Sequence, residues 1–154
     1  MKFITDCMLG TLAKWLRILG YDTLYYRFIE DTALIQKALR TQRTLLTRDE
    51  EVFRKFKSPD KLLIQSDDVM SQLKQVIEEK KLEVGSQLFT RCVLCNTRLI
   101  RVDKEEIQHL VPEYVFKTQQ EFSICNHCKK IYWKGTHRTR MMEKLKNLEE
   151  SLKL

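Results

Sequence analysis

Four of the five cysteines form two pairs with the same short spacing, Cys92-x-x-Cys95 and Cys125-x-x-Cys128. Each turn places two sulfur atoms on one side of a metal ion, and two turns complete the tetrahedral thiolate shell that Zn²⁺ prefers. The 29 residues from 96 to 124 leave room for a small sheet between the pairs. We therefore predict a structural zinc site. The alternatives are two unrelated thiol pairs or a redox dithiol, although a redox pair is expected at a strand-to-helix turn.

Carboxylates in the first half of the chain could support a different metal chemistry. Asp6 and Asp49 each follow an expected strand, whereas Asp31 and the pair Asp67-Asp68 lie where helices should begin. In a parallel sheet these positions meet at one edge, where acidic side chains repel one another unless a cation lies between them. Oxygen ligands with open positions suit Mg²⁺ or Mn²⁺. The aspartates at the helix starts could instead be N-caps.

Ions held in this way would form a hydrolytic centre. One or two of them could deprotonate a water, hold a scissile phosphate and stabilise the leaving oxygen. Lys14 and Arg17 lie three residues apart on an expected helix, on the side away from its leucines. Together with Arg48 they could contact a phosphate backbone. A solvated helix face, or for Arg48 an ion pair with an acidic neighbour, would account for the same residues.

The elements that must position these residues alternate between strands and helices over residues 1 to about 80. Such alternation is typical of a parallel sheet with helices on its faces. Gly20 is expected to end the first helix as a C-cap. Cys7 is expected to be a small buried residue, and Asp22 and Asp60 to be turn residues. The expected strands are 2–5, 23–28, 43–47 and 61–65, and the expected helices have apolar faces within 9–19, 34–39, 53–56 and 69–77.

The character of the chain changes near residue 90. Residues 81–90 have the composition of a linker, and short β-like stretches surround the cysteine pairs beyond it. Tyr132, Trp133 and His137 would form a ribbon core or a seam between domains, or else a stacking platform for an unpaired base. Apolar residues at helical spacing predict an amphipathic C-terminal helix. The predicted domains span 1–85 and 90–137, with the C-terminal helix at 138–154.

Charge and composition narrow the class of protein. Hydrophobic residues make up 43% of the chain, enough for a packed core, and 28 basic against 21 acidic residues leave a formal charge of +7. This excess favours an anionic partner such as nucleic acid, although a merely basic surface would give the same charge. No apolar run approaches the ~18 residues of a membrane span, and a charge at Asp6 interrupts any signal peptide. We therefore expect a cytoplasmic protein with reduced thiols and no membrane partner.

Four motifs, in this order along the chain, resemble the mutator-seven C-terminal ribonuclease family. They are DCMLGTLAKWLRILGYD at 6–22, LTRD at 46–49, RCxxCN at 91–96 and CxxCKKIYWKGTH at 125–137. In that family a PIN-like nuclease domain is followed by a zinc ribbon. The resemblance implies an α/β/α sandwich with a parallel sheet and an acidic metal site that cleaves single-stranded RNA. For this chain it implies that residues 1–85 are the nuclease domain and 90–137 the ribbon.

Carried over by position, Asp6 matches the aspartate after the first strand, Asp31 the acidic residue of the second helix and Asp49 the Thr-x-Asp aspartate. Asp67 and Asp68 both fit a fourth acidic position, and Asp68 is preferred. The hypothesis is an endoribonuclease in which Asp6, Asp31 and Asp49 bind Mg²⁺ or Mn²⁺ and a metal-activated water cleaves RNA.

Two other hypotheses stay open. The first is a non-catalytic zinc-ribbon module that binds RNA or the ribosome. The second is an adaptor whose ribbon docks a protein. The sequence leaves open the RNA target, the metal preference, the oligomeric state and inhibition by a protein partner.

Overall fold

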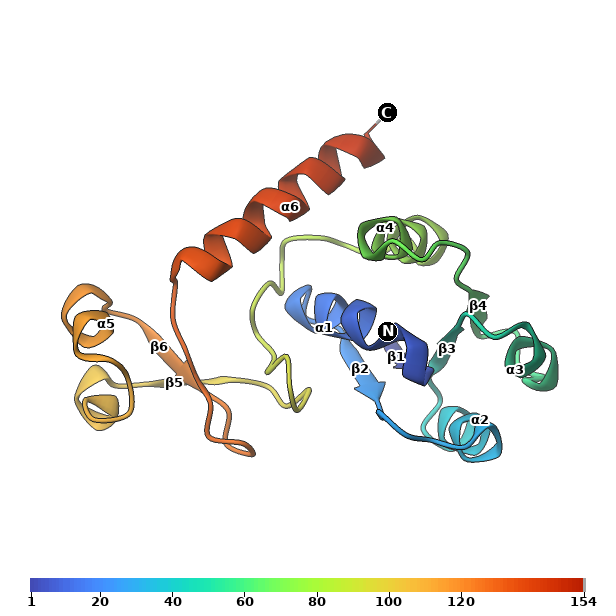
Figure 1. Cartoon of the computed structure of the whole chain (residues 1–154), viewed down its shortest axis with the longest axis horizontal. Helices are drawn as coiled ribbons and strands as arrows, with labels where there is room; N and C mark the ends of the chain where they lie inside the picture. The colour runs from blue at the N-terminus through green and yellow to red at the C-terminus, as the bar shows by residue number, and fades with distance from the viewer. Residues whose placement is uncertain (154) are drawn as a thin grey trace. The chain divides into compact units, whose positions relative to one another are not determined.

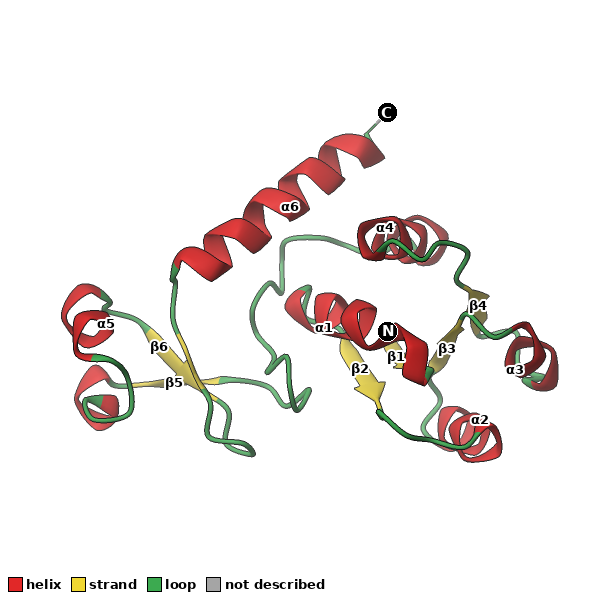
Figure 2. Ribbon diagram, viewed as in Figure 1, coloured by secondary structure: helices red, strands yellow, loops and turns green. Residues whose placement is uncertain are grey.

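The computed structural model describes residues 1–153, and the chain divides into two compact units, Met1–Asn96 and Thr97–Leu154. Each unit contains one sheet (Figures 1 and 2). The first sheet has four parallel strands and the second has three antiparallel strands. Parallel strands require long crossover connections, whereas antiparallel strands can be joined by short turns. Within the described part of the chain, no helix combines the length and apolar character that crossing a membrane requires.

The parallel sheet of the first unit has the strand order β2-β1-β3-β4. Its strands are β1 (Lys2–Thr5), β2 (Asp22–Tyr25), β3 (Thr44–Thr47) and β4 (Lys61–Leu63). The four expected strands are therefore confirmed: β1 has the expected bounds, and the other three strands are one or two residues shorter than expected. From β1 the chain continues to β2 on one side, and then crosses to β3 on the other side of β1. The direction of the strand order therefore reverses between β1 and β3.

Helices cover both faces of this sheet (Figure 1). Ile4 of β1 and its neighbour Leu45 of β3 are fully buried against Leu34 of α2 and Val52 and Phe56 of α3. Helices α1 and α4 contact each other over the opposite face. The α-helices are α1 (Gly10–Ile18), α2 (Asp31–Arg40), α3 (Glu50–Lys55) and α4 (Val69–Lys80), and a 3₁₀ turn, η1 (Cys7–Leu9), precedes α1.

Gly20 ends the first helix, as its sequence position predicts. Its φ of +95° is a left-handed conformation that favours glycine. A Cβ at this position would lie 2.4 Å from the carbonyl oxygen of Gln87, so the close approach of residues 87–91 also requires glycine. The segment that the sequence marks as a linker therefore packs closely against the end of α1.

The second unit is built around the antiparallel sheet β5-β6-β7. Ile107, Val115 and Phe122 form its small buried core, and Trp133 packs against it with its ring 6.4 Å from that of Phe122. The expectation of Trp133 in a ribbon core agrees with this packing. The elements are β5 (Ile100–Val102), η2 (Lys104–Ile107), α5 (Glu113–Thr118), β6 (Phe122–Ile124), β7 (Ile131–Tyr132) and α6 (Thr136–Leu152).

The last helix of the chain, α6, is where the spacing of apolar residues predicts one, although it begins two residues earlier than expected. Leu145 and Leu148 are buried, as the amphipathic pattern requires. Residue 154, the end of the predicted segment, lies outside the described residues.

Candidate active site and metal centre

Asp6 and Asp49 lie at the carboxyl edge of the parallel sheet, where β1 and β3 end. Ligands in open α/β sheets bind outside the carboxyl ends of the strands where the strand order reverses. β1 and β3 are hydrogen-bonded neighbours on either side of that reversal. The topology therefore places these two aspartates where a ligand site is expected, and the other loops of this edge follow β2 and β4.

The Asp6 carboxylate is buried, with 4% of the residue exposed, and is held by three donors. Its Oδ2 accepts hydrogen bonds from the Thr47 hydroxyl at 2.6 Å and from the Arg48 amide at 2.8 Å. Its Oδ1 accepts one from the Met8 amide at 2.8 Å. A buried carboxylate needs such partners, and here they fix the orientation of both oxygens.

Asp49 is linked to Asp6 through the side chain of Thr47. The Asp49 amide donates to the Thr47 hydroxyl oxygen at 3.0 Å, and that hydroxyl donates to Asp6. The Asp49 side chain also caps α3, with Oδ1 accepting from the amides of Glu51 and Val52. The cap uses only Oδ1, so Oδ2 is not needed to begin the helix.

Asp31 and Asp68 occupy two different kinds of position. Asp31 is exposed in the first turn of α2, whose N-cap is Glu30, so the interpretation of Asp31 as an N-cap is wrong. Asp68 does cap α4, and hydrogen bonds from the Ser71 amide and hydroxyl lower the pKa of its carboxyl. Asp67, the other candidate for this position, is exposed and precedes the cap.

The pKa of Lys55 in α3 responds to the negative charges of Asp31 and Asp49. Its ammonium lies 2.9 Å from the Glu51 carboxylate, and this hydrogen bond is the main reason that the pKa of Lys55 is raised. The charges of Asp31 and Asp49 raise it further. The two aspartates therefore act on one lysine from different elements, although this exposed ion pair contributes little stability.

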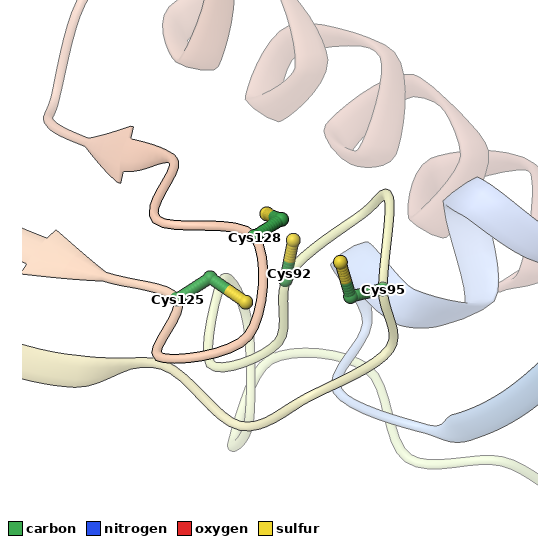
Figure 3. A group of neighbouring side chains, drawn as sticks. All are labelled: Cys92, Cys95, Cys125 and Cys128. Atoms are coloured by element: carbon green, nitrogen blue, oxygen red, sulfur yellow. The ribbon is translucent and has the colours of Figure 1, made fainter.

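The described residues contain one group of three or more His, Cys, Asp or Glu side chains that could hold an ion, and it is made of cysteines. The four sulfur atoms of Cys92, Cys95, Cys125 and Cys128 all lie within 4.8 Å of one another, and Figure 3 shows them gathered at one point. Tetrahedral Zn–S bonds of ~2.3 Å separate neighbouring sulfurs by about 3.8 Å. The cluster fits zinc, and all four thiols are free of disulfides. The aspartates form no comparable group.

Both cysteine turns have the same local geometry. Asn96 and Lys129, which directly follow the second cysteine of each pair, have φ of 67° and 65°. The Asn96 amide donates to the Cys92 carbonyl at 2.9 Å, and the Lys129 amide donates to the Cys125 carbonyl at 2.8 Å. A left-handed residue closes each turn, and asparagine tolerates this conformation better than most residues.

Arg17 is not on an exposed helix face, so the expectation that it points away from the apolar side is wrong. Only 5% of it is exposed. Its Nε donates to the Thr23 carbonyl at 2.9 Å, and Nη1 donates to the Val93 carbonyl at 2.8 Å and the Leu94 carbonyl at 3.3 Å. Arg17 therefore ties the first cysteine turn to α1 and β2. Lys14 and Arg48 are exposed, as a contact with RNA requires.

Asn96 attaches the same turn to the edge strand β2. Its Oδ1 accepts from the Thr23 amide at 2.9 Å, and its Nδ2 donates to Asp22 Oδ1 at 2.7 Å. Asp22 also pairs with Arg43 at 2.7 Å, so the expectation that it is only a turn residue is wrong. Burial opposes ionisation of Asp22, but the hydrogen bonds from Arg43 and Asn96 outweigh it and lower its pKa. Spacing along the sequence contains no signal for this network.

Cys7 also differs from expectation, because it is exposed. It begins the 3₁₀ turn that follows Asp6, and its carbonyl accepts a hydrogen bond from the Tyr25 hydroxyl at 3.2 Å. The 3₁₀ turn buries Leu9 and leaves Cys7 and Met8 outside. The backbone of this residue thus contributes to the edge that carries Asp6, and its side chain does not fill the core.

The fold and the site define an α/β protein with a parallel sheet, aspartates at the carboxyl edge of that sheet, and four clustered cysteines that could hold a metal ion. The chain belongs to the Mut7-C RNAse domain family, whose model matches residues 1–145. The family points to a ribonuclease with RNA as its substrate. Neither the curated proteins nor the solved structures contain a significant match.

Proposed function

We propose that this protein is a metal-dependent endoribonuclease that cleaves single-stranded RNA. The observation that carries the proposal is the pair Asp6 and Asp49, joined through the Thr47 hydroxyl at the carboxyl edge of the parallel sheet. In a chain of the Mut7-C RNAse domain family, this edge is the best candidate for the reaction centre. The first unit would then be the PIN-like nuclease domain, and the four thiolates, which leave no open position on zinc, would be structural.

The residues at this edge fit Mg²⁺ or Mn²⁺. Both ions prefer hard oxygen ligands, and a bound ion would supply an activated water and stabilise charge on the phosphate. Asp6 is orientated by three donors: Oδ2 accepts two of these hydrogen bonds and Oδ1 accepts one, so a lone pair for a further ligand remains on Oδ1. Asp49 Oδ2 is not used by the helix cap. Asp31 and Asp68 would add carboxylates from α2 and from the start of α4.

The RNA backbone would be held by exposed cations. Lys14 of α1 and Arg48, directly before Asp49, are exposed and keep this role in the proposal. Arg17 does not, because it is 5% exposed and donates to three backbone carbonyls. Arg48 also contributes its backbone amide to Asp6, so its position is coupled to the reaction centre.

The test is cleavage of a labelled single-stranded RNA in Mg²⁺ or Mn²⁺ by the wild type and by Asp49→Asn. Asparagine caps helices as well as aspartate does, so α3 should keep its start. Loss of a metal ligand should lower the cleavage rate by more than about a hundredfold, because loss of groups that merely support a ligand already costs 10–100-fold.

The matched control is Asp60→Asn. Asp60 is an exposed carboxylate directly before β4, at the amino end of the strand. This variant should cleave at the wild-type rate. Asp6→Asn is a poorer choice, because the NH2 group of the new amide would face at least one of the donors that now bind the Asp6 oxygens. Equal rates for wild type and Asp49→Asn would refute the role of Asp49.

The second candidate is a non-catalytic module that binds RNA or the ribosome. One observation favours it: Asp49 and Asp68 both cap helices, and the aspartates of residues 1–153 form no close ion-binding group. The same assay distinguishes the two functions. A module of this kind would bind RNA with a steep dependence on salt, and it would leave the RNA intact with either metal.

A further inference from the structure

Phe28 is the most exposed large hydrophobic side chain among residues 1–153, with 86% of it accessible to solvent. Single exposed apolar residues are common, so exposure alone carries no argument. The position of Phe28 is the informative feature, because Phe28 lies in the loop that joins β2 to α2, three residues before Asp31. This loop begins at the carboxyl edge of the sheet, which also bears Asp6 and Asp49.

The register of the sheet aligns this loop with the one that contains Asp6. Thr5, the last residue of β1, is paired with Tyr25, the last residue of β2. The loops starting at Asp6 and Tyr26 therefore leave the sheet side by side. The Tyr25 hydroxyl donates to the Cys7 carbonyl at 3.2 Å, which ties the two loops together. Met8, two residues after Asp6, is 56% exposed and adds a second apolar group to the edge.

Arg27 accompanies the exposed ring. Its guanidinium carbon lies 5.5 Å from the centroid of the Phe28 ring, within the range of a cation–π contact. Both residues are exposed. An arginine next to an aromatic ring offers two contacts that suit a nucleotide, because the ring stacks on a base and the guanidinium contacts a base or a phosphate.

The charge of the edge favours a contact with RNA that does not depend on phosphate. The carboxylates of Asp6, Asp31 and Asp49 oppose the attraction of nearby phosphates to the exposed cations and to a bound metal ion. Stacking on an aromatic face is independent of charge and tolerates any base. It also requires a base that is not already stacked in a duplex, which selects single strands.

We propose that Phe28 and Arg27 form a stacking platform for one unpaired base of a single-stranded RNA bound at the acidic edge. The proposal rests on the proposed function, because it names the substrate contact of the same site. The platform differs from the proposed ribonuclease activity because it requires no cleavage: it binds RNA whether or not the strand is cut.

The experiment measures binding of a fluorescein-labelled 12-nucleotide oligouridine RNA to the full-length protein, in Ca²⁺ so that binding is read without turnover. Phe28→Leu keeps an apolar side chain but removes the aromatic face, and it should weaken binding about tenfold. Phe28→Tyr keeps the face and should bind within about twofold of the wild type. Tyr114→Leu removes another exposed aromatic ring, 70% accessible on α5, and should leave binding unchanged.

A second measurement detects stacking directly. An otherwise identical RNA carries single 2-aminopurine substitutions, and stacking on a ring quenches this fluorophore. Quenching should occur with wild type and Phe28→Tyr, and disappear with Phe28→Leu. Because position 28 is exposed, the variants should unfold at the same temperature, which excludes misfolding as the cause.

The outcomes separate this proposal from the ribonuclease assignment. Wild-type binding and quenching by Phe28→Leu would overturn the platform, and cleavage lost in Asp49→Asn would then leave the ribonuclease standing. Quenching that depends on Phe28, in a protein that cuts no RNA, would support the platform and overturn the ribonuclease.

Discussion

Replacing Arg17 by methionine tests whether its guanidinium holds the first cysteine turn in place. Methionine keeps an apolar stem but removes the donors to the carbonyls of Thr23 at 2.9 Å, Val93 at 2.8 Å and Leu94 at 3.3 Å. A hydrogen bond from a charged donor contributes about 1.5–3 kcal/mol. Counting the two short bonds, we expect the free energy of unfolding to fall by about 3–6 kcal/mol. That is a large part of the ~5–15 kcal/mol that stabilises an ordinary domain.

Urea denaturation followed by tryptophan fluorescence at pH 7 measures this loss. Lys14→Met is the matched control, because Lys14 is exposed on the same helix, and it should stay within about 0.5 kcal/mol of the wild type. Arg17→Lys separates charge from geometry. One ammonium cannot replace a planar fork of donors, so this variant should lose most of the same stability although it keeps the charge.

In RNA binding, the Lys14 variant should show the effect and the Arg17 variant should not. Lys14→Met should reduce the slope of log K against log salt by about 0.7, the value for one lost contact to a single strand. Arg17→Lys should leave that slope unchanged. The reasoning is refuted if Arg17→Met unfolds within about 1 kcal/mol of the wild type. If such a stable variant bound RNA more weakly, Arg17 would instead contact the phosphate backbone, as its sequence position suggests.

Two further predictions concern the groups around this turn. Asp22 has a lowered pKa in the folded protein, so the stability it contributes is present above about pH 3.9, the ordinary value for aspartate, and is lost as the pH falls through its folded pKa. The stability deficit of Asp22→Asn at pH 7 should therefore shrink at pH 3 in urea titrations, whereas Asp60→Asn should show no such deficit. Elemental mass spectrometry should find one Zn²⁺ per chain, bound by the cysteine cluster. A chelator should raise amide hydrogen exchange across β5, β6 and β7, because metal binding and folding are coupled. The Thr23 amide, which donates to Asn96 Oδ1 in the first unit, should stay protected. Unchanged exchange across the ribbon would contradict the zinc assignment.

Local features of this protein could be predicted from its sequence because each depends on a few neighbouring residues. The two C-x-x-C turns have the same spacing and the same local geometry, and a left-handed residue closes both. The alternation of strands and helices, and the helix end at Gly20, follow from periodicity and from the conformational freedom of glycine. The aspartates at the ends of β1 and β3 could be placed at one edge because parallel strands bring their carboxyl ends together.

Only the tertiary structure decided which polar groups meet. Arg17 binds carbonyls 76 and 77 residues away, and Asn96 reaches Thr23 across 73 residues. Helical spacing assigned Arg17 to the exposed face because it describes one helix alone, whereas in the folded unit the carbonyls of Val93 and Leu94 bind its guanidinium. The Thr47 hydroxyl that joins Asp6 to Asp49 is equally invisible to spacing, since it depends on the register of β1 and β3. Partners of buried polar groups are set by chain segments distant in sequence, and no local pattern encodes them.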